Sequence, residues 1–106
     1  MKRNEKVANR IKEFAAEFLG RENNRASLIT VTSCHVSPDL RRATVFITVF
    51  PDSKEKSALE FAKRKCKGLR ELLKKNLPIK NIPFIEMAID FGEKNRQKID
   101  ELLRNS

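Results

Sequence analysis

The sequence predicts an α+β fold in which three helices and three strands follow one another in the order α-β-β-α-β-α. Two runs rich in β-branched residues, 28–36 and 42–50, and one alternating run, 84–91, indicate the strands. The segments around them repeat their apolar residues at helical spacing. A three-stranded sheet with helices packed on one face is the simplest fold that buries these apolar surfaces.

The first helix is expected at about residues 4–19. Its apolar residues recur every three or four positions and therefore form one stripe on a helix. They are Val7, Ile11, Phe14 and Phe18. Gly20 follows this stripe and is the expected end of the helix, since glycine is common just beyond helix ends.

An antiparallel hairpin is expected next. In the run 42–50, apolar residues occupy both faces, so helices should cover one face and the other should be partly covered. Between the two runs, Ser37, Pro38 and Asp39 are residues typical of a tight turn. So short a connection favours antiparallel pairing.

A long helical run follows, from about residue 54 to residue 76. Asp52 and Glu55 resemble a capping box at its start, and Pro78 ends it. Gly68 lies in the middle, where glycine costs about 1 kcal/mol relative to alanine, so it indicates either a close packing contact or a kink. The apolar stripe of this run consists of Leu59, Ala62, Cys66, Leu69 and Leu73.

The third strand alternates apolar residues with Glu86 and Asp90, a pattern typical of a half-exposed strand. Gly92 is expected to turn the chain after it. Residues 93–104 then form a short last helix, whose apolar residues are Ile99, Leu102 and Leu103.

Composition limits the classes to which the chain can belong. Its 106 residues, 40% of them hydrophobic, correspond to one ordinary domain, 1–106. No apolar stretch approaches the roughly 20 residues of a membrane span, and no signal peptide is visible. Two cysteines and one histidine, without a CxxC motif, favour free thiols in a reducing compartment and argue against zinc. We expect a cytoplasmic monomer without metal or cofactor.

A net charge of +9 indicates a polyanionic partner. The excess is local, because residues 54–80 carry 10 basic and 3 acidic side chains. Like charges at helical spacing weaken a lone helix unless counter-charges arrive, which favours phosphate contact over a merely solvated face. The cations that recur about 100° from the apolar stripe are Lys63, Lys67, Arg70 and Lys74, broadened by Arg64, Lys65 and Lys75 and extended by Lys80.

Motifs for catalysis are weak. Cys34 and His35 could suggest a nucleophile and a base, but neighbours on a strand point to opposite faces, so we expect Cys34 in the core and His35 at the surface. Glu86 and Asp90 share a strand face and could hold a divalent cation, although a solvated face explains them more simply.

Stacking on RNA bases would require exposed aromatic rings. The chain has seven phenylalanines and no tryptophan or tyrosine, and we expect most of these rings in the core. Phe46 and Phe50, on the second predicted strand, are the two rings that could stack on RNA bases.

Several segments resemble the bacterial ribosome-binding factor A family. Residues 37–47 are similar to its S-x-D-L-x-x-A-x-V-[YF] hallmark, and residues 28–32 to its L-[IV]-T-[IV]-T strand. Residues 3–11 resemble its opening helix, residues 68–73 its G-x-[IL]-R-x-x-L helix, and residues 83–90 its P-x-[IL]-x-F-x-x-D ending. The resemblance covers nearly the whole chain in order.

This resemblance implies a type II KH-like fold with the order α-β-β-α(kink)α-β-α. In that family a helix–kink–helix with the sequence A-x-G replaces the usual GxxG loop. Residues 66–68 occupy the matching position, with Cys66 where the family has alanine. Cysteine is also small, so the kink should be preserved, and it would account for Gly68.

The resemblance also implies an assembly factor rather than an enzyme. Members bind the free small (30S) ribosomal subunit and 16S rRNA, support late maturation and 5′-end processing of that rRNA, and help growth in the cold. Carried over by position, the RNA-binding candidates are Lys63, Arg64, Lys67, Gly68, Arg70 and Lys74. Charge adds Lys75 and Lys80, with Arg41 and Arg42 as weaker candidates beside the hairpin turn.

Two other classes of function stay open. A general RNA-binding or chaperone module would use the same cations without ribosome specificity. A metal-dependent nuclease would need Glu86 and Asp90, and Glu86→Gln with Asp90→Asn would remove its activity. We expect neither a small-molecule substrate nor a membrane partner.

Overall fold

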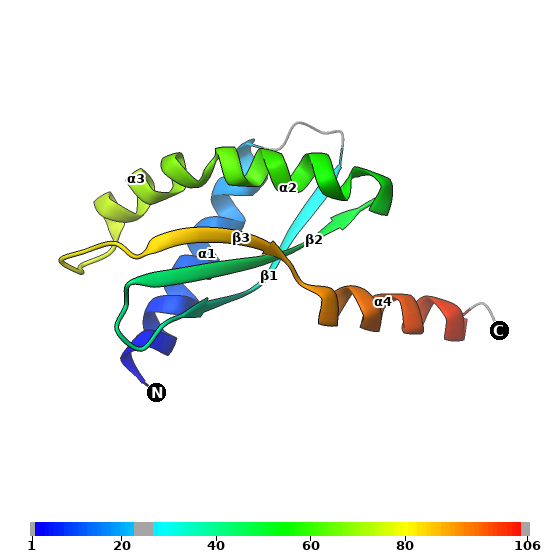
Figure 1. Ribbon diagram of the computed structural model, residues 1–106, viewed down its shortest axis with the longest axis horizontal. Helices are drawn as coiled ribbons and strands as arrows, with labels where there is room; N and C mark the ends of the chain where they lie inside the picture. Colours follow the sequence, from blue (N-terminus) through cyan, green and yellow to red (C-terminus); the bar gives the residue numbers. More distant parts are fainter. Residues whose placement is uncertain (1, 23–26, 105–106) are drawn as a thin grey trace.

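The computed structural model describes residues 2–22 and 27–104. One sheet of three strands carries helices α1, α2 and α3 on one face, while α4 extends away from it (Figure 1). The predicted α+β class and the order of a type II KH-like domain are confirmed. The elements are α1 (Arg3–Glu22), β1 (Leu28–Val36), β2 (Arg42–Phe50), the 3-10 turn η1 (Asp52–Lys54), α2 (Glu55–Arg64), α3 (Cys66–Asn76), β3 (Phe84–Ile89) and α4 (Phe91–Arg104).

The sheet has the strand order β1-β2-β3, so β2 is central. It pairs antiparallel with β1, which confirms the hairpin, and parallel with β3, which requires the long crossover through α2 and α3. Alternate residues of β2 face the helices and are buried: Ala43, Val45, Ile47 and Val49. This face and the apolar sides of α1, α2 and α3 form the core.

The turn between β1 and β2 is stabilised by its own side chains. Ser37 Oγ donates to Asp39 Oδ1 (2.6 Å), which also accepts the backbone N–H of Arg41 (3.1 Å). The N–H of Arg42 donates back to Ser37 Oγ (3.1 Å). These bonds, the one from Ser37 above all, favour the charged carboxylate and lower the pKa of Asp39. They give a physical reason for serine and aspartate at these two positions.

The central helical run is interrupted at Lys65, which separates α2 from α3. The predicted kink is therefore confirmed, one residue before Cys66. Gly68 lies in the first turn of α3, where a Cβ atom would stand 2.9 Å from Cζ of Phe18 on α1. Close packing explains the glycine, and the break itself lies at Lys65.

Gly68→Val is expected to destabilise the protein by ~1–3 kcal/mol, because the added methyl groups must displace the half-buried ring of Phe18. The same substitution should cost markedly less in a Phe18→Ala background. Urea unfolding of the four proteins in this double-mutant cycle measures the coupling. Equal costs in both backgrounds would mean that the ring does not explain the glycine.

Two predicted features of helix ends are wrong. Helix α1 continues two residues past Gly20, which is exposed and has open space around it. No capping box forms at the start of α2, because the chain enters through η1 and the N-cap residue Lys54 makes no side-chain cap hydrogen bond. Glu55 instead pairs with Lys94 of α4 at 2.9 Å, which ties the two helices together.

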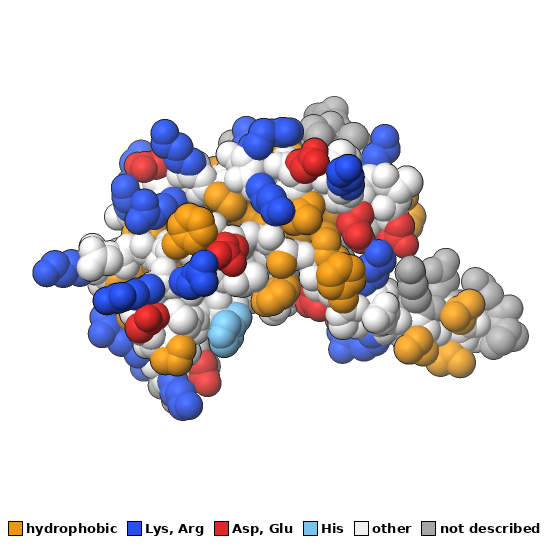
Figure 2. Space-filling view, in the orientation of Figure 1, with side chains coloured by type: hydrophobic (Ala, Val, Ile, Leu, Met, Phe, Trp, Pro, Cys, Tyr) orange, Lys and Arg blue, Asp and Glu red, His pale blue; other side chains and the backbone are white. Residues whose placement is uncertain are grey.

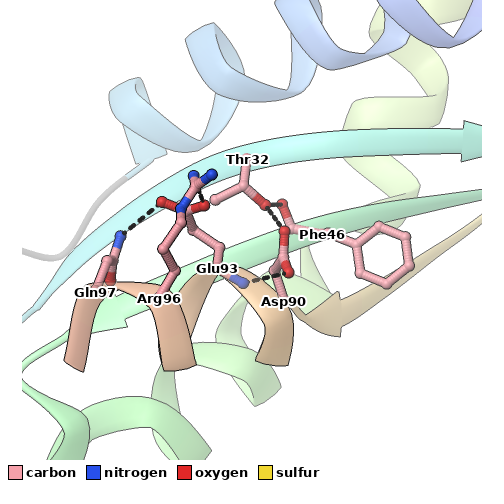
Figure 3. A network of polar contacts seen from close by, with 6 residues as sticks. All are labelled: Thr32, Phe46, Asp90, Glu93, Arg96 and Gln97. Carbon is pink, nitrogen blue, oxygen red and sulfur yellow. Dashed lines mark hydrogen bonds and ion pairs between the residues drawn. The ribbon is translucent and has the colours of Figure 1, made fainter. Parts of the chain in front are cut away.

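The start of α4 also differs from the prediction, since the helix begins at Phe91 and Gly92 lies inside it. Asp90 caps this helix: Oδ1 accepts the N–H of Glu93 (3.0 Å), and Oδ2 accepts the hydroxyl of Thr32 (2.6 Å) (Figure 3). Thr32 lies where the register between β1 and β2 shifts. The bond from Thr32, followed by that from Glu93, lowers the pKa of Asp90. A capping residue, not glycine, therefore marks the boundary.

Candidate nucleic-acid interface

Most cations predicted from the sequence lie exposed on α2 and α3. We call these residues the basic stripe: Lys63, Arg64, Lys67, Arg70, Lys74 and Lys75. Figure 2 shows Lys and Arg side chains gathered over this part of the molecule and over the end that carries the loop after α3. Six of the predicted residues are thus exposed to solvent on this pair of helices.

The opposite side of these helices fixes the stripe in place. Ala62, Leu69 and Leu73 are completely buried against the sheet and α1. Within the stripe, Lys74 pairs with Glu71 at 3.4 Å, but both side chains are about half exposed, so the pair contributes little to stability. The stripe is therefore a rigid surface with a strong excess of positive charge.

Arg41 and Lys80, which lie far apart in the sequence, line the same hollow as Arg70. This basic hollow has a volume of about 480 Å³ and is also lined by Arg3 at the start of α1 and by one acid, Asp39, which lies 3.9 Å from Arg41. The guanidinium of Arg70 donates to the carbonyl of Ile82 (3.3 Å), which orients it there. Arg3 was not predicted from the sequence, because nothing local to the first residue of α1 indicates which distant residues lie beside it.

Two of the predicted residues have other roles. Arg42 lies outside the hollow and pairs with Glu86 of β3 at 3.2 Å. Gly68 is exposed and lies against the ring of Phe18, where it allows α3 to pack closely on α1.

The aromatic prediction is wrong in its main part. Among the described residues, no phenylalanine belongs to the fully buried core. Phe46 is half-buried, and Phe50 is 73% exposed. Phe84 and Phe91, which the sequence argument did not single out, are also exposed. Phe84 could have been found, since it shares the strand face of Glu86 rather than that of the apolar residues.

The residues considered for catalysis are engaged or separated. Cys34 packs against the core, where burial raises the pKa of its thiol to about 12, and His35 is exposed, which confirms their predicted positions. Asp90 caps α4, and Glu86 pairs with a cation. In the described part of the chain, no three His, Cys, Asp or Glu side chains lie together as metal ligands.

Within the part of the chain that the structure describes, residues 2–22 and 27–104, every helix is too short or too polar to span a bilayer.

Comparison with known proteins gives one consistent family. A family model described as "Ribosome-binding factor A" matches residues 3–103. Ribosome-binding factor A of Paenarthrobacter aurescens is 38% identical over 104 residues, 95% of this chain and 62% of that protein. The protein of the same name from Thermobifida fusca is 38% identical over 101 residues, 92% of this chain and 67% of its own length. The chain thus spans about three fifths to two thirds of these curated relatives.

Solved structures show the same fold. The crystal structure of ribosome-binding factor A from Thermus thermophilus aligns with a TM-score of 0.73 and 21% identity, covering 81% of this chain and 93% of that one. A homology model of the Thermus thermophilus factor, fitted into a cryo-EM map of its 30S complex, aligns with a TM-score of 0.67 and 22% identity, covering 76% and 88%.

Proposed function

Because the chain belongs to the ribosome-binding factor A family, we propose that it binds the free small ribosomal subunit and contacts 16S rRNA through the basic stripe. The observation that carries this proposal is the exposed, rigid stripe of six cations on α2 and α3. The related factor from Thermus thermophilus, fitted into a 30S complex, supports the choice of partner.

Phosphate contacts would supply the affinity. Lysine and arginine neutralise backbone phosphates without reading sequence, and folded RNA is recognised largely by its shape and backbone. A stripe on a fixed pair of helices suits this mode, because the spacing of its cations is set before binding. Binding should therefore weaken steeply as salt rises.

Membership of the family supports a proposal for the biological role. We propose that residues 1–106 act as one KH-like ribosome-binding domain, a monomer in the cytoplasm. The proposed domain supports late maturation and 5′-end processing of 16S rRNA, including growth in the cold. Its action in this proposal is binding, without a cofactor, a small-molecule substrate or a catalytic step.

A competition experiment separates this role from that of a general RNA-binding module. Labelled protein bound to purified small subunits is challenged with unlabelled small subunits or with random-sequence RNA at equal nucleotide concentration. We expect the subunits to displace the label at a concentration at least tenfold lower, about 1.4 kcal/mol of preference. Equal displacement by random RNA would overturn the proposal and favour the general module.

A further inference from the structure

An exposed aromatic ring lies beside the basic stripe. Phe84 is the first residue of β3 and is 60% exposed, while Ile85 and Met87 on the other side of the strand are buried. Its backbone is fixed, because its N–H donates to the carbonyl of Arg41 (2.9 Å) and it pairs in register with Arg42. The ring is therefore held at the surface by the sheet and cannot withdraw into the core.

Two hollows share this ring. One is the basic hollow, with Arg41, Arg70 and Lys80. The other, of about 520 Å³, lies at the break between α2 and α3 and is lined by Lys63, Cys66 and the acid Glu86, which pairs with Arg42. Phe84 lines both hollows, so its ring stands between the helix break and the basic hollow. Cations thus flank an exposed aromatic face on both sides.

This combination suits one kind of RNA. Successive phosphates of a single strand can follow cations while an unpaired base stacks on an aromatic face. In a duplex the bases are already stacked on one another, so the ring has nothing to add. Each hollow is also of the size that holds one small organic group.

The other exposed rings lack this setting. Phe91 is 62% exposed but lies at the start of α4, where one cation, Lys94, lies 6.0 Å from its ring centre. Phe50 lines a hollow in which one cation, Lys94, is balanced by one acid, Asp52, whereas the two hollows beside Phe84 together hold five cations and two acids. The neighbourhood of Phe84, not exposure alone, distinguishes it.

We propose that Phe84 stacks on an unpaired nucleotide of the bound RNA, with the phosphates on either side held by Lys63 in one hollow and by Arg41 and Lys80 in the other. This inference rests on the proposed function and adds to it a single-stranded segment as the element that the protein recognises. The stripe supplies affinity for any backbone phosphate, whereas the ring selects for a base outside a helix.

The test compares Phe84→Leu with Phe91→Leu as a control of matched exposure. Each protein is titrated with a fluorescent 12-nucleotide single-stranded RNA and with a 12-base-pair RNA duplex. We expect Phe84→Leu to bind the single strand about tenfold more weakly, with an unchanged salt dependence, and to bind the duplex normally. Phe91→Leu should match wild type on both RNAs, and thermal melting checks that both variants fold.

Unchanged binding of the single strand by Phe84→Leu, or an equal loss in Phe91→Leu, would overturn the stacking site. Arg41→Ala and Lys80→Ala give a second readout, since each should reduce the slope of log affinity against log salt by about one. Binding of wild type to small subunits is measured in parallel. If it persists while Phe84→Leu has no effect on RNA, the stacking site fails and the proposed function stands.

Discussion

Ile47→Asp is expected to abolish the cooperative thermal unfolding of this protein. Ile47 lies on the central strand β2 with none of its surface exposed, and it faces the helices that cover the sheet. Burying a carboxylate there without a partner costs several kcal/mol, and the lost apolar packing adds to this. Because domains of this size are stable by about 5–15 kcal/mol, the variant should be largely unfolded.

Thr30→Asp is the matched control, since it places the same charge on an exposed position of the neighbouring strand β1. This variant should keep a cooperative transition close to that of wild type. Circular dichroism against temperature distinguishes the two. A cooperative transition of Ile47→Asp at the wild-type temperature would mean that the orientation of β2 is wrong.

Lys63→Glu combined with Lys67→Glu is expected to weaken binding to small subunits at least tenfold. Both side chains are exposed in the basic stripe, one on each side of the helix break. Losing two phosphate contacts should also reduce the slope of log affinity against log salt by about two. The fold should survive, because acidic side chains are well tolerated in the first turn of a helix, where Lys67 lies.

The control variant changes the net charge of the protein by the same amount, but at positions outside the basic stripe. Lys6→Glu with Lys12→Glu alters two exposed positions of α1. A long-range effect of net charge would weaken both double variants alike, whereas a docking surface on α2 and α3 predicts a loss in the first alone. Equal affinities of the two variants would refute the stripe as the binding surface.

The stripe could be predicted from the sequence because it is a local property. Residues 63–75 lie within one helical run, so their spacing alone determines which of them share a face. The same periodicity located the buried side of this run, and Leu69 and Leu73 are indeed buried. The two strands of the hairpin could be predicted equally well. Their alternating or β-branched residues and the turn residues between them all lie within one segment of 23 residues.

The basic hollow could not be predicted in the same way. Its cations come from the start of α1, the hairpin turn, α3 and the loop after it, and they are brought together by the parallel pairing of β3 with β2 and by the packing of α1 against β1 and α3. Nothing in the spacing of Arg3 and Lys80 along the chain indicates that both line this hollow. The same arrangement places the exposed ring of Phe84 beside these cations.

The predictions of where α1 ends and α4 begins were wrong for a different reason. In a sequence, Gly20 and Gly92 are typical of a helix end or a turn. A glycine inside a helix, however, costs only about 1 kcal/mol relative to alanine, which tertiary contacts of the neighbouring residues can offset. The first turn of α4 is held by Asp90 and by the pair of Lys94 with Glu55, both of which depend on tertiary contacts. Ile99 and Leu102, apolar residues of that helix, are exposed.

The central claim, that this protein recognises the free small ribosomal subunit, is tested most directly by co-sedimentation. The protein is mixed with purified small subunits, large subunits or assembled ribosomes, each across a salt series. We expect it to sediment with free small subunits, with binding that weakens steeply with salt but persists beyond the salt concentration that releases the other particles. Equal binding to all three particles, lost together in moderate salt, would contradict this claim.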